Sequence, residues 1–225
     1  MKYLYNIGCS FSEGNGIGED RGLLNCKRPN WDEIHALEAK LRYSALLSKK
    51  LGLKEINQAN GGGSNQRIFR KTWNWIAENP KLLSETLFVI QWSYPLRSEY
   101  YGRSRKGGRK WYNMDNAGLI KRGFKVPDPE TSSDISLRYI LSLQSFFKEH
   151  KVNFIFFEGD DTCIEGTIDL LSDLGKLIDL NHWILESFVS FSGKELTLNG
   201  HPNEQMQIVW ASKLEKFIKD KNWLS

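Results

Sequence analysis

The chain has 225 residues, of which 40% are hydrophobic and 26% are charged, a balance typical of a globular protein. It contains no apolar stretch near the roughly 20 residues of a membrane-spanning helix, and its start shows no secretory leader. We therefore expect a cytoplasmic protein without a membrane contact. Cys9, Cys26 and Cys163 are odd in number and lack metal-ligand spacing, so we expect neither a disulfide framework nor a metal, and no cofactor.

The net charge of +4 is unevenly distributed. Residues 97–125 carry nine basic side chains and only two acidic ones, Glu99 and Asp115, so the rest of the chain is slightly acidic. Positive charge gathered in one segment indicates a local binding surface or a solvated loop, rather than a basic protein as a whole.

Strand-like and helix-like segments alternate along the chain. Apolar runs predict five strands, at about 2–8, 54–59, 87–92, 152–158 and 183–191. Helical spacing and capping residues predict helices at 35–51, 65–78, 132–150 and 203–220. This alternation favours an α/β fold, a three-layer α/β/α sandwich around a parallel, flavodoxin-like sheet of five strands. We expect one domain over residues 1–225, with a basic, aromatic insertion at about 94–131.

The first candidate site follows the first strand. The apolar run ends in Gly8-Cys9-Ser10, which places a hydroxyl at the carboxyl end of the sheet, where α/β folds keep their chemistry. Ser10 is a candidate nucleophile, and the alternative is a turn or helix-capping serine.

Two further candidates follow the second and third strands. Gly61, Gly62 and Gly63 allow backbone N–H groups to point at an oxyanion or a phosphate, although the segment lacks the Lys-Ser/Thr ending of a P-loop. The alternative is a flexible tight turn. After the third strand, Trp92 and Tyr94 could wall a pocket, and Arg97 could bind an anion or pair with Glu99.

The fourth candidate is His201, in a loop before the last helix. Pro202 favours an extended backbone at His201, as a catalytic base needs, and the alternative is a plain loop histidine. The other histidines, His35, His150 and His182, lie in helices or apolar runs, where packing or surface roles are more common.

Together these segments resemble the SGNH (GDSL-like) hydrolase family over most of the chain, in particular a phage- or bacteria-associated branch that begins Gly-Cys-Ser-Phe. Gly8-Cys9-Ser10-Phe11-Ser12 is similar to the first block, with Ser10 as nucleophile. Gly62 is similar to the second-block glycine of the oxyanion hole, and His201-Pro202-Asn203 is similar to the last block, where the histidine is the general base.

Two supporting positions depart from the family pattern. Ser93 stands where the third block usually has an oxyanion-binding Asn, and Leu198 stands where the last block has an Asp three residues before the histidine. The resemblance therefore implies a Ser10–His201 dyad, with an oxyanion hole of Ser10, Gly62 and Ser93. Asn65 and Asn199 are candidate supporting residues, and Asn199 or a backbone carbonyl could hold the imidazole tautomer.

The implied activity is ester hydrolysis on a small-molecule or carbohydrate substrate, acyl or acetyl, with the insertion as a wall that selects an anionic or carbohydrate-like group. The candidate substrate-binding residues are Trp92, Tyr94, Arg97, Arg103, Arg105 and Arg109. A second hypothesis is a catalytically weakened SGNH-like protein that binds nucleic acid or an anionic glycan through the insertion, where aromatic and basic residues alternate. A third is Cys9 as the nucleophile.

Overall fold

The fold is built on one parallel sheet. A computed structural model describes residues 1–24, 29–103, 108–160, 169–191 and 196–224. The five strands of the sheet are β1 (Tyr3–Ile7), β2 (Lys54–Asn57), β3 (Thr86–Trp92), β6 (Phe154–Glu158) and β7 (Trp183–Ile184). Their order is β2-β1-β3-β6-β7, and all neighbouring pairs are parallel. The predicted five-stranded parallel sheet is confirmed.

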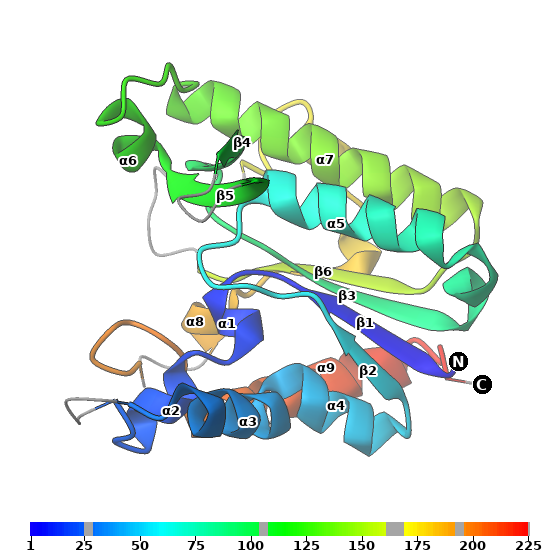
Figure 1. Cartoon of the computed structure of the whole chain (residues 1–225). Coiled ribbons are helices and arrows are strands. Elements are labelled where there is room, and N and C mark those ends of the chain that lie inside the picture. The colour runs from blue at the N-terminus through cyan, green and yellow to red at the C-terminus, as the bar shows by residue number, and fades with distance from the viewer. Residues whose placement is uncertain (25–28, 104–107, 161–168, 192–195, 225) are drawn as a thin grey trace.

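Helices cover both faces of this sheet (Figure 1). The α-helices are α1 (Ser10–Glu13), α2 (Gly16–Asp20), α3 (Trp31–Leu41), α4 (Tyr43–Leu51), α5 (Asn65–Glu78), α6 (Asn116–Ile120), α7 (Pro129–Glu149), α8 (Phe188–Phe191) and α9 (Glu204–Asp220). Short 3-10 helices lie at Pro80–Glu85, Gly175–Leu177 and Leu180–His182. The long helices α5 and α7 lie on one face, and α4 and α9 on the other (Figure 1).

Alternate side chains of the central strands fill two separate cores. On β3, Phe88 and Ile90 pack toward α5 and α7, whereas Leu87 and Val89 pack toward α4 and α9. Every residue of β3 is buried, as expected for a strand covered on both faces. Burying one large apolar side chain contributes about 1.5–3 kcal/mol, so the two cores hold the carboxyl edge of the sheet in a fixed position.

The helix expected over 35–51 is divided in two. Arg42 has an extended backbone, with φ −61° and ψ 149°, so α3 ends before it and α4 begins after it. The Arg42 side chain makes two hydrogen bonds to Glu55 on β2, at 2.8 and 2.7 Å. Gln207 of α9 accepts a hydrogen bond from the backbone N–H of Tyr43, the first residue of α4. These tertiary contacts override a continuous helical pattern.

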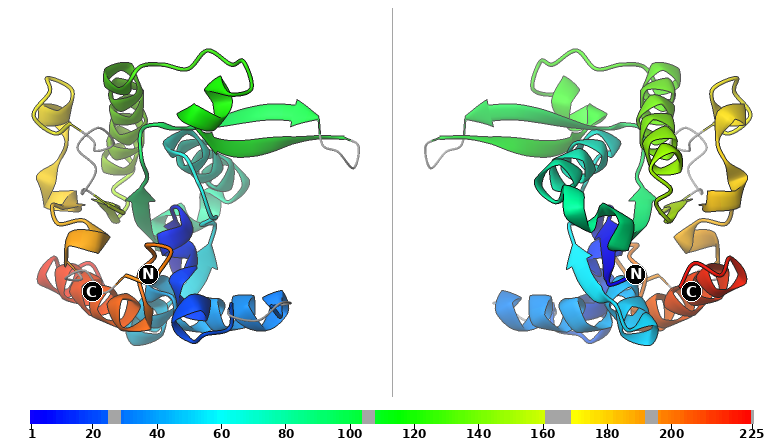
Figure 2. Two further views of the ribbon diagram at one scale, coloured as in Figure 1. Left: turned by 90° about the vertical axis from the view of Figure 1, so that its left-hand side faces the viewer. Right: turned by 90° about the vertical axis from the view of Figure 1, so that its right-hand side faces the viewer.

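The region at 94–131 contains regular structure that the sequence pattern did not indicate. Strands β4 (Arg97–Arg103) and β5 (Arg109–Asp115) form an antiparallel hairpin. Cross-strand ring pairs hold it, Tyr101 with Trp111 and Tyr100 with Tyr112. Figure 2 shows the hairpin extending well beyond the rest of the chain. The strand expected over 183–191 is also shorter, because the chain turns into α8 after β7.

Among the described residues, no helix combines the length and the apolar character needed to cross a membrane.

Candidate active site

Ser10 is the first residue of α1 and comes directly after the turn that ends β1. The residue is 7% exposed, and among the described residues its hydroxyl has no hydrogen-bond partner. As the first residue of a helix, it also has a backbone N–H without an intrahelical acceptor. Ser10 therefore has both a free hydroxyl and a free N–H at the carboxyl edge of the sheet.

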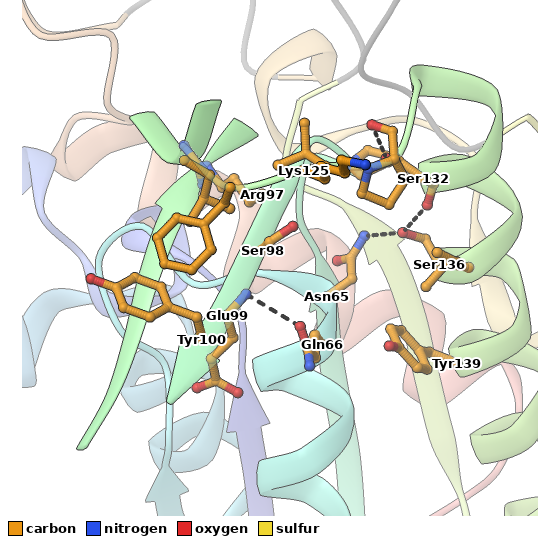
Figure 3. A pocket seen from close by; sticks show the side chains of 16 residues that line it. Asn65, Gln66, Arg97, Ser98, Glu99, Tyr100, Lys125, Ser132, Ser136 and Tyr139 are labelled. Carbon is orange, nitrogen blue, oxygen red and sulfur yellow. Dashed lines mark hydrogen bonds between the residues drawn. The ribbon is translucent and has the colours of Figure 1, made fainter. Parts of the chain in front are cut away.

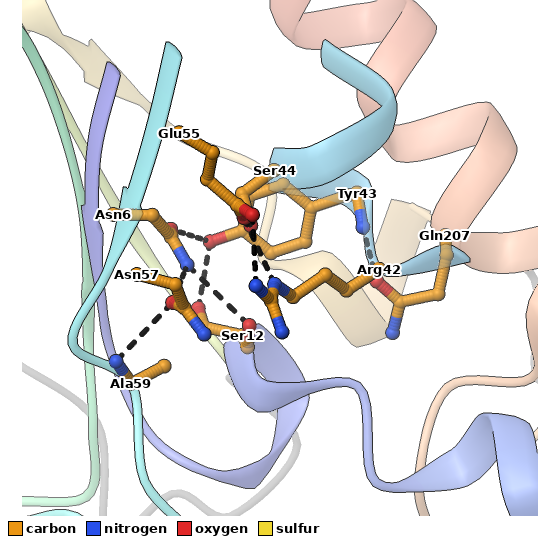
Figure 4. Close-up of polar contacts among 9 residues, drawn as sticks. All are labelled: Asn6, Ser12, Arg42, Tyr43, Ser44, Glu55, Asn57, Ala59 and Gln207. Carbon is orange, nitrogen blue, oxygen red and sulfur yellow. Dashed lines mark hydrogen bonds and ion pairs between the residues drawn. The ribbon is translucent and has the colours of Figure 1, made fainter. Parts of the chain in front are cut away.

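A buried polar network fixes the turn that carries Ser10 (Figure 4). The Tyr43 hydroxyl donates to Asn6 Oδ1 at 2.6 Å and lies 2.6 Å from Ser12 Oγ. Asn6 Nδ2 in turn donates to Asn57 Oδ1 at 2.7 Å. Burial raises the pKa of Tyr43, so its hydroxyl stays protonated. Residues from β1, β2 and α4 thus support the start of α1.

Gln91 at the end of β3 contacts the same turn from the other side. Its Oε1 accepts hydrogen bonds from the N–H and the hydroxyl of Ser12, at 3.2 and 2.6 Å, and its Nε2 lies 3.0 Å from Cys9 Sγ. Gln91 and Cys9 are both almost fully buried. Cys9 therefore points into the protein, where it packs against Gln91.

The glycine loop lies against the Ser10 turn. A Cβ on Gly63 would lie 2.9 Å from Gly8 O and 3.5 Å from Cys9 Cα, so this approach requires glycine. The N–H of Gly61 donates to Glu13 Oε2 at 2.5 Å, and that of Gly63 donates to Asn60 O at 2.9 Å. Among the described residues, the N–H of Gly62 has no acceptor. Gly62 is the glycine of the three whose donor is free.

Asn65 ties this loop to the end of β3. Its Oδ1 accepts from Ser93 N at 2.7 Å and its Nδ2 donates to Ser93 O at 2.8 Å, so one amide side chain pairs with both backbone groups of Ser93. Arg97 Nη1 donates to Ser93 Oγ at 3.0 Å. The Ser93 hydroxyl accepts from a cation, and its own proton remains available for another acceptor.

His201 lies beside the residue that follows Ser10. The rings of Phe11 and His201 meet edge to face, with centroids 5.8 Å apart. Among the described residues no hydrogen bond joins His201 to Ser10, and catalytic hydrogen bonds are often longer without substrate. Burial lowers the pKa of His201; the Glu19 carboxylate opposes this shift, and the Arg97 guanidinium adds to it. His201 is therefore neutral, and able to accept a proton, at lower pH than an ordinary histidine.

Glu19 on α2 holds the loop that carries His201. Its carboxylate accepts hydrogen bonds from Thr197 Oγ1 at 2.5 Å, Asn199 N at 3.0 Å and Asn199 Nδ2 at 2.5 Å. Thr197 in turn pairs with His201, through Thr197 N to His201 O at 2.8 Å and His201 N to Thr197 Oγ1 at 3.2 Å. Leu198 is 98% exposed. Sequence reasoning did not select Glu19, because no local pattern links it to a loop 180 positions away.

Asn199 contacts Glu19 rather than the His201 ring. From the sequence, Asn199 or a backbone carbonyl is expected to hold the imidazole tautomer. In the structure Asn199 acts on the loop through its hydrogen bonds to Glu19.

A cavity of about 240 Å³ has His201 in its wall. Among the described residues, three carboxylates, one exposed indole ring and a second histidine line it, and no lysine or arginine does: Glu13, Glu19, Glu38, Trp31 and His35. Glu38 is 4% exposed, and its burial raises the pKa of its carboxyl group. The cavity can accept hydrogen bonds from hydroxyl groups and offers a ring for stacking.

The residues proposed to bind substrate lie in different places. Trp92 is fully buried and packs against Phe156, so it is a core residue and walls no pocket, because the alternating pattern of β3 points it inward. Tyr94 is half-buried, donates a hydrogen bond to Asp160 at 2.5 Å and lies under Arg97. Arg109 is exposed on the hairpin. Arg105 and the side chain of Arg103 lie outside the described residues.

In the described ranges of the chain, no group of three histidine, cysteine, aspartate or glutamate side chains is arranged to hold a metal ion.

A model of a family of unknown function, DUF6071, matches residues 27–224. The chain belongs to this family. A comparison of this DUF6071 protein with curated protein sequences gives no match.

Solved structures with a similar fold include esterases. The psychrotrophic esterase EstA from Pseudoalteromonas sp. is 13% identical, with a TM-score of 0.53 over 100% of this chain and 99% of that one. The structure of TesA is 14% identical, with a TM-score of 0.55 over 97% of this chain and 99% of that one. A family two carbohydrate esterase from Cellvibrio japonicus is 14% identical, with a TM-score of 0.57, and the DUF6071 chain spans 63% of its length. At these identities the likeness shows a shared fold.

Proposed function

We propose that this DUF6071 protein is a serine esterase of the SGNH type, with Ser10 as nucleophile and His201 as general base. The observation that carries the proposal is the meeting of four separate segments at one edge of the sheet. Contacts of Gly63 with Gly8, of Asn65 with Ser93, and of Phe11 with His201 join these segments in pairs. The fold shared with esterases supports the reaction class.

The proposed reaction follows from the groups that are free at this edge. Ser10 Oγ attacks the ester carbonyl carbon, and its proton passes to the neutral imidazole of His201. The N–H groups of Ser10 and Gly62 and the Ser93 hydroxyl donate to the oxyanion. Collapse expels the alcohol, which takes the proton from His201. Water, deprotonated by His201, then releases the acid and restores Ser10.

Two features replace family groups that this chain lacks. Arg97 polarises the Ser93 hydroxyl through the 3.0 Å hydrogen bond, and so strengthens a donor that is otherwise weaker than an amide. Glu19 supplies a negative charge near His201 in place of the carboxylate absent at Leu198. We propose that Glu19 is a positioning residue, which acts through the loop of residues 197–201 and through its charge.

The cavity beside His201 favours a hydroxylated alcohol group over an anionic one, because carboxylates line it. We therefore propose a carbohydrate or other polyhydroxylated ester as substrate, with its alcohol part against Trp31.

Labelling with a fluorophosphonate and hydrolysis of 4-nitrophenyl acetate test the proposal. We expect the wild-type chain to be labelled and active, and Ser10→Ala to be neither. His201→Ala should lose hydrolysis by several orders of magnitude. Cys9→Ser serves as the matched control, since Cys9 packs against Gln91. If Ser10→Ala keeps full activity, or if Cys9→Ser alone abolishes it, the assignment is wrong.

The hairpin supports a second candidate function, a binding protein for nucleic acid or an anionic glycan. Tyr101 and Trp111 are 54% and 42% exposed and form a pair, and Arg109 and Lys110 beside them are exposed. Stacking rings next to cations suit a single-stranded polynucleotide. Binding of oligo(dT) that weakens steeply with salt, in a chain that a fluorophosphonate does not label, would favour this candidate.

A further inference from the structure

A second cavity, of about 280 Å³, lies between the hairpin and α7, with Asn65 in its wall (Figure 3). Three elements enclose it: the start of α5, the insertion, and the first turns of α7. Half of its described lining residues are apolar or aromatic, among them Tyr100, Leu119, Phe124, Val126, Ile135 and Tyr139. Such a lining suits a small aromatic or short aliphatic group.

Among the described residues that line it, this cavity carries more positive than negative charge. Glu99 is its one carboxylate among the described lining residues, and both of its oxygens are bound by Arg70, at 2.8 and 2.6 Å. Arg97 is half-buried and contacts the Ser93 hydroxyl and the Tyr94 ring, and in the described part of the chain it pairs with no carboxylate. Lys125 is exposed at the same cavity. A half-buried guanidinium without an anionic partner favours an anionic ligand.

We propose that this cavity binds a small amphipathic carboxylate, with its carboxylate on Arg97 and Lys125 and its apolar body against Ile135 and Tyr139. Arg97 also donates a hydrogen bond to Ser93 Oγ. A carboxylate bound to Arg97 therefore competes with the Ser93 hydroxyl for the guanidinium. Binding in the cavity therefore lowers the rate of ester hydrolysis. The binding itself does not depend on Ser10.

Calorimetric titration of the full chain with 2-naphthoate tests the site, and naphthalene-2-carboxamide is the uncharged control of the same shape. We expect 2-naphthoate to bind one to one, and the carboxamide to bind about tenfold more weakly or not at all. Arg97→Gln should reduce the affinity for 2-naphthoate to that for the carboxamide. Ser10→Ala should bind 2-naphthoate as the wild type does, which separates this site from the catalytic one.

Two variants of α7 locate the ligand. Ile135→Trp puts an indole into the cavity and should abolish binding, whereas Arg138→Trp puts the same ring on the exposed face of the helix and should leave it unchanged. Thermal unfolding verifies that both variants are folded. The proposal is overturned by equal binding of the two naphthalenes, by unaltered binding to a folded Ile135→Trp chain, or by no binding of 2-naphthoate. If Ile135→Trp fails to fold, the affinities of Arg97→Gln and wild type for 2-naphthoate decide: equal affinities overturn the proposal.

Discussion

Replacing Glu19 by glutamine tests whether its charge, and not only its shape, serves His201. The glutamine oxygen can keep the two hydrogen bonds from Asn199, and its amide can face Thr197 Oγ1. The loop geometry is then retained while the negative charge is lost. A hydrogen bond to a charged group contributes about 1.5–3 kcal/mol and a neutral one about 0.5–1.5 kcal/mol.

Because Glu19 is only half-buried, solvent screens its charge, and we take a reduced loss of about 1–2 kcal/mol in total. Each 1.36 kcal/mol corresponds to a factor of ten in rate, so we expect kcat/KM to fall about tenfold. The direction in which the pH–rate profile moves tests the charge of Glu19 separately from the rate. Glu19 raises the pKa of His201, so its loss lowers that pKa further and moves the acidic limb of the pH–rate profile to lower pH.

The assay is kcat/KM for 4-nitrophenyl acetate across the acidic limb. Arg97→Gln should move this limb the opposite way, to higher pH, because the guanidinium lowers the pKa of His201. Asp20→Asn makes the same charge change on the neighbouring residue of α2 and should leave the limb in place. If Glu19→Gln lowers the rate without moving the limb, the charge has no part in the reaction. If neither the rate nor the position of the acidic limb changes, Glu19 does not position His201.

Two further predictions concern the support of the site. Gly62 has a φ of +69° with open space around its Cβ position, so Gly62→Ala should cost about 1 kcal/mol of unfolding free energy. Gly63→Ala should lower kcat more than Gly62→Ala does, because its Cβ meets Gly8 O and pushes the loop from the Ser10 turn; equal kcat values would contradict this packing. Tyr43→Phe removes the buried donor to Asn6 Oδ1 and the contact with Ser12 Oγ, and should cost about 1–3 kcal/mol in urea unfolding. The exposed Tyr101→Phe is its control, and a similar small loss in both variants would refute the role of the network.

The parts of the fold that the sequence predicted well are those with a local signal. The apolar runs of β1, β3 and β6 mark buried parallel strands, and Ser64 caps a helix whose observed bounds, Asn65–Glu78, match the predicted range. The division between α3 and α4 at Arg42 depends on tertiary contacts with Glu55 and Gln207. The hairpin of β4 and β5 depends on contacts between aromatic rings of its two strands. A sequence pattern carries no record of such partners.

The candidate site divides in the same way. Ser10, Gly62, Ser93 and His201 follow strand ends or precede a helix, which is where a pattern search looks, and their catalytic roles stay predictions. Gln91 and Glu19 are ordinary polar residues in sequence, and only the distances to Ser12 and to Asn199 reveal their contacts. Trp92 shows the reverse error, since a tryptophan near a strand end is as suited to the core as to a pocket.

The contact between the first and last segments has a consequence for when the chain becomes competent during folding. Gln207 of α9 donates to Phe11 O across 196 positions of sequence. Contacts of such separation require closure of nearly the whole chain, and they are slow to form. In the proposed reaction, a chain with its sheet formed but α9 undocked holds the nucleophile without its base. Hydrolysis would then be the last property to appear on refolding, later than the secondary structure, and the first to vanish when the C-terminal helix loosens.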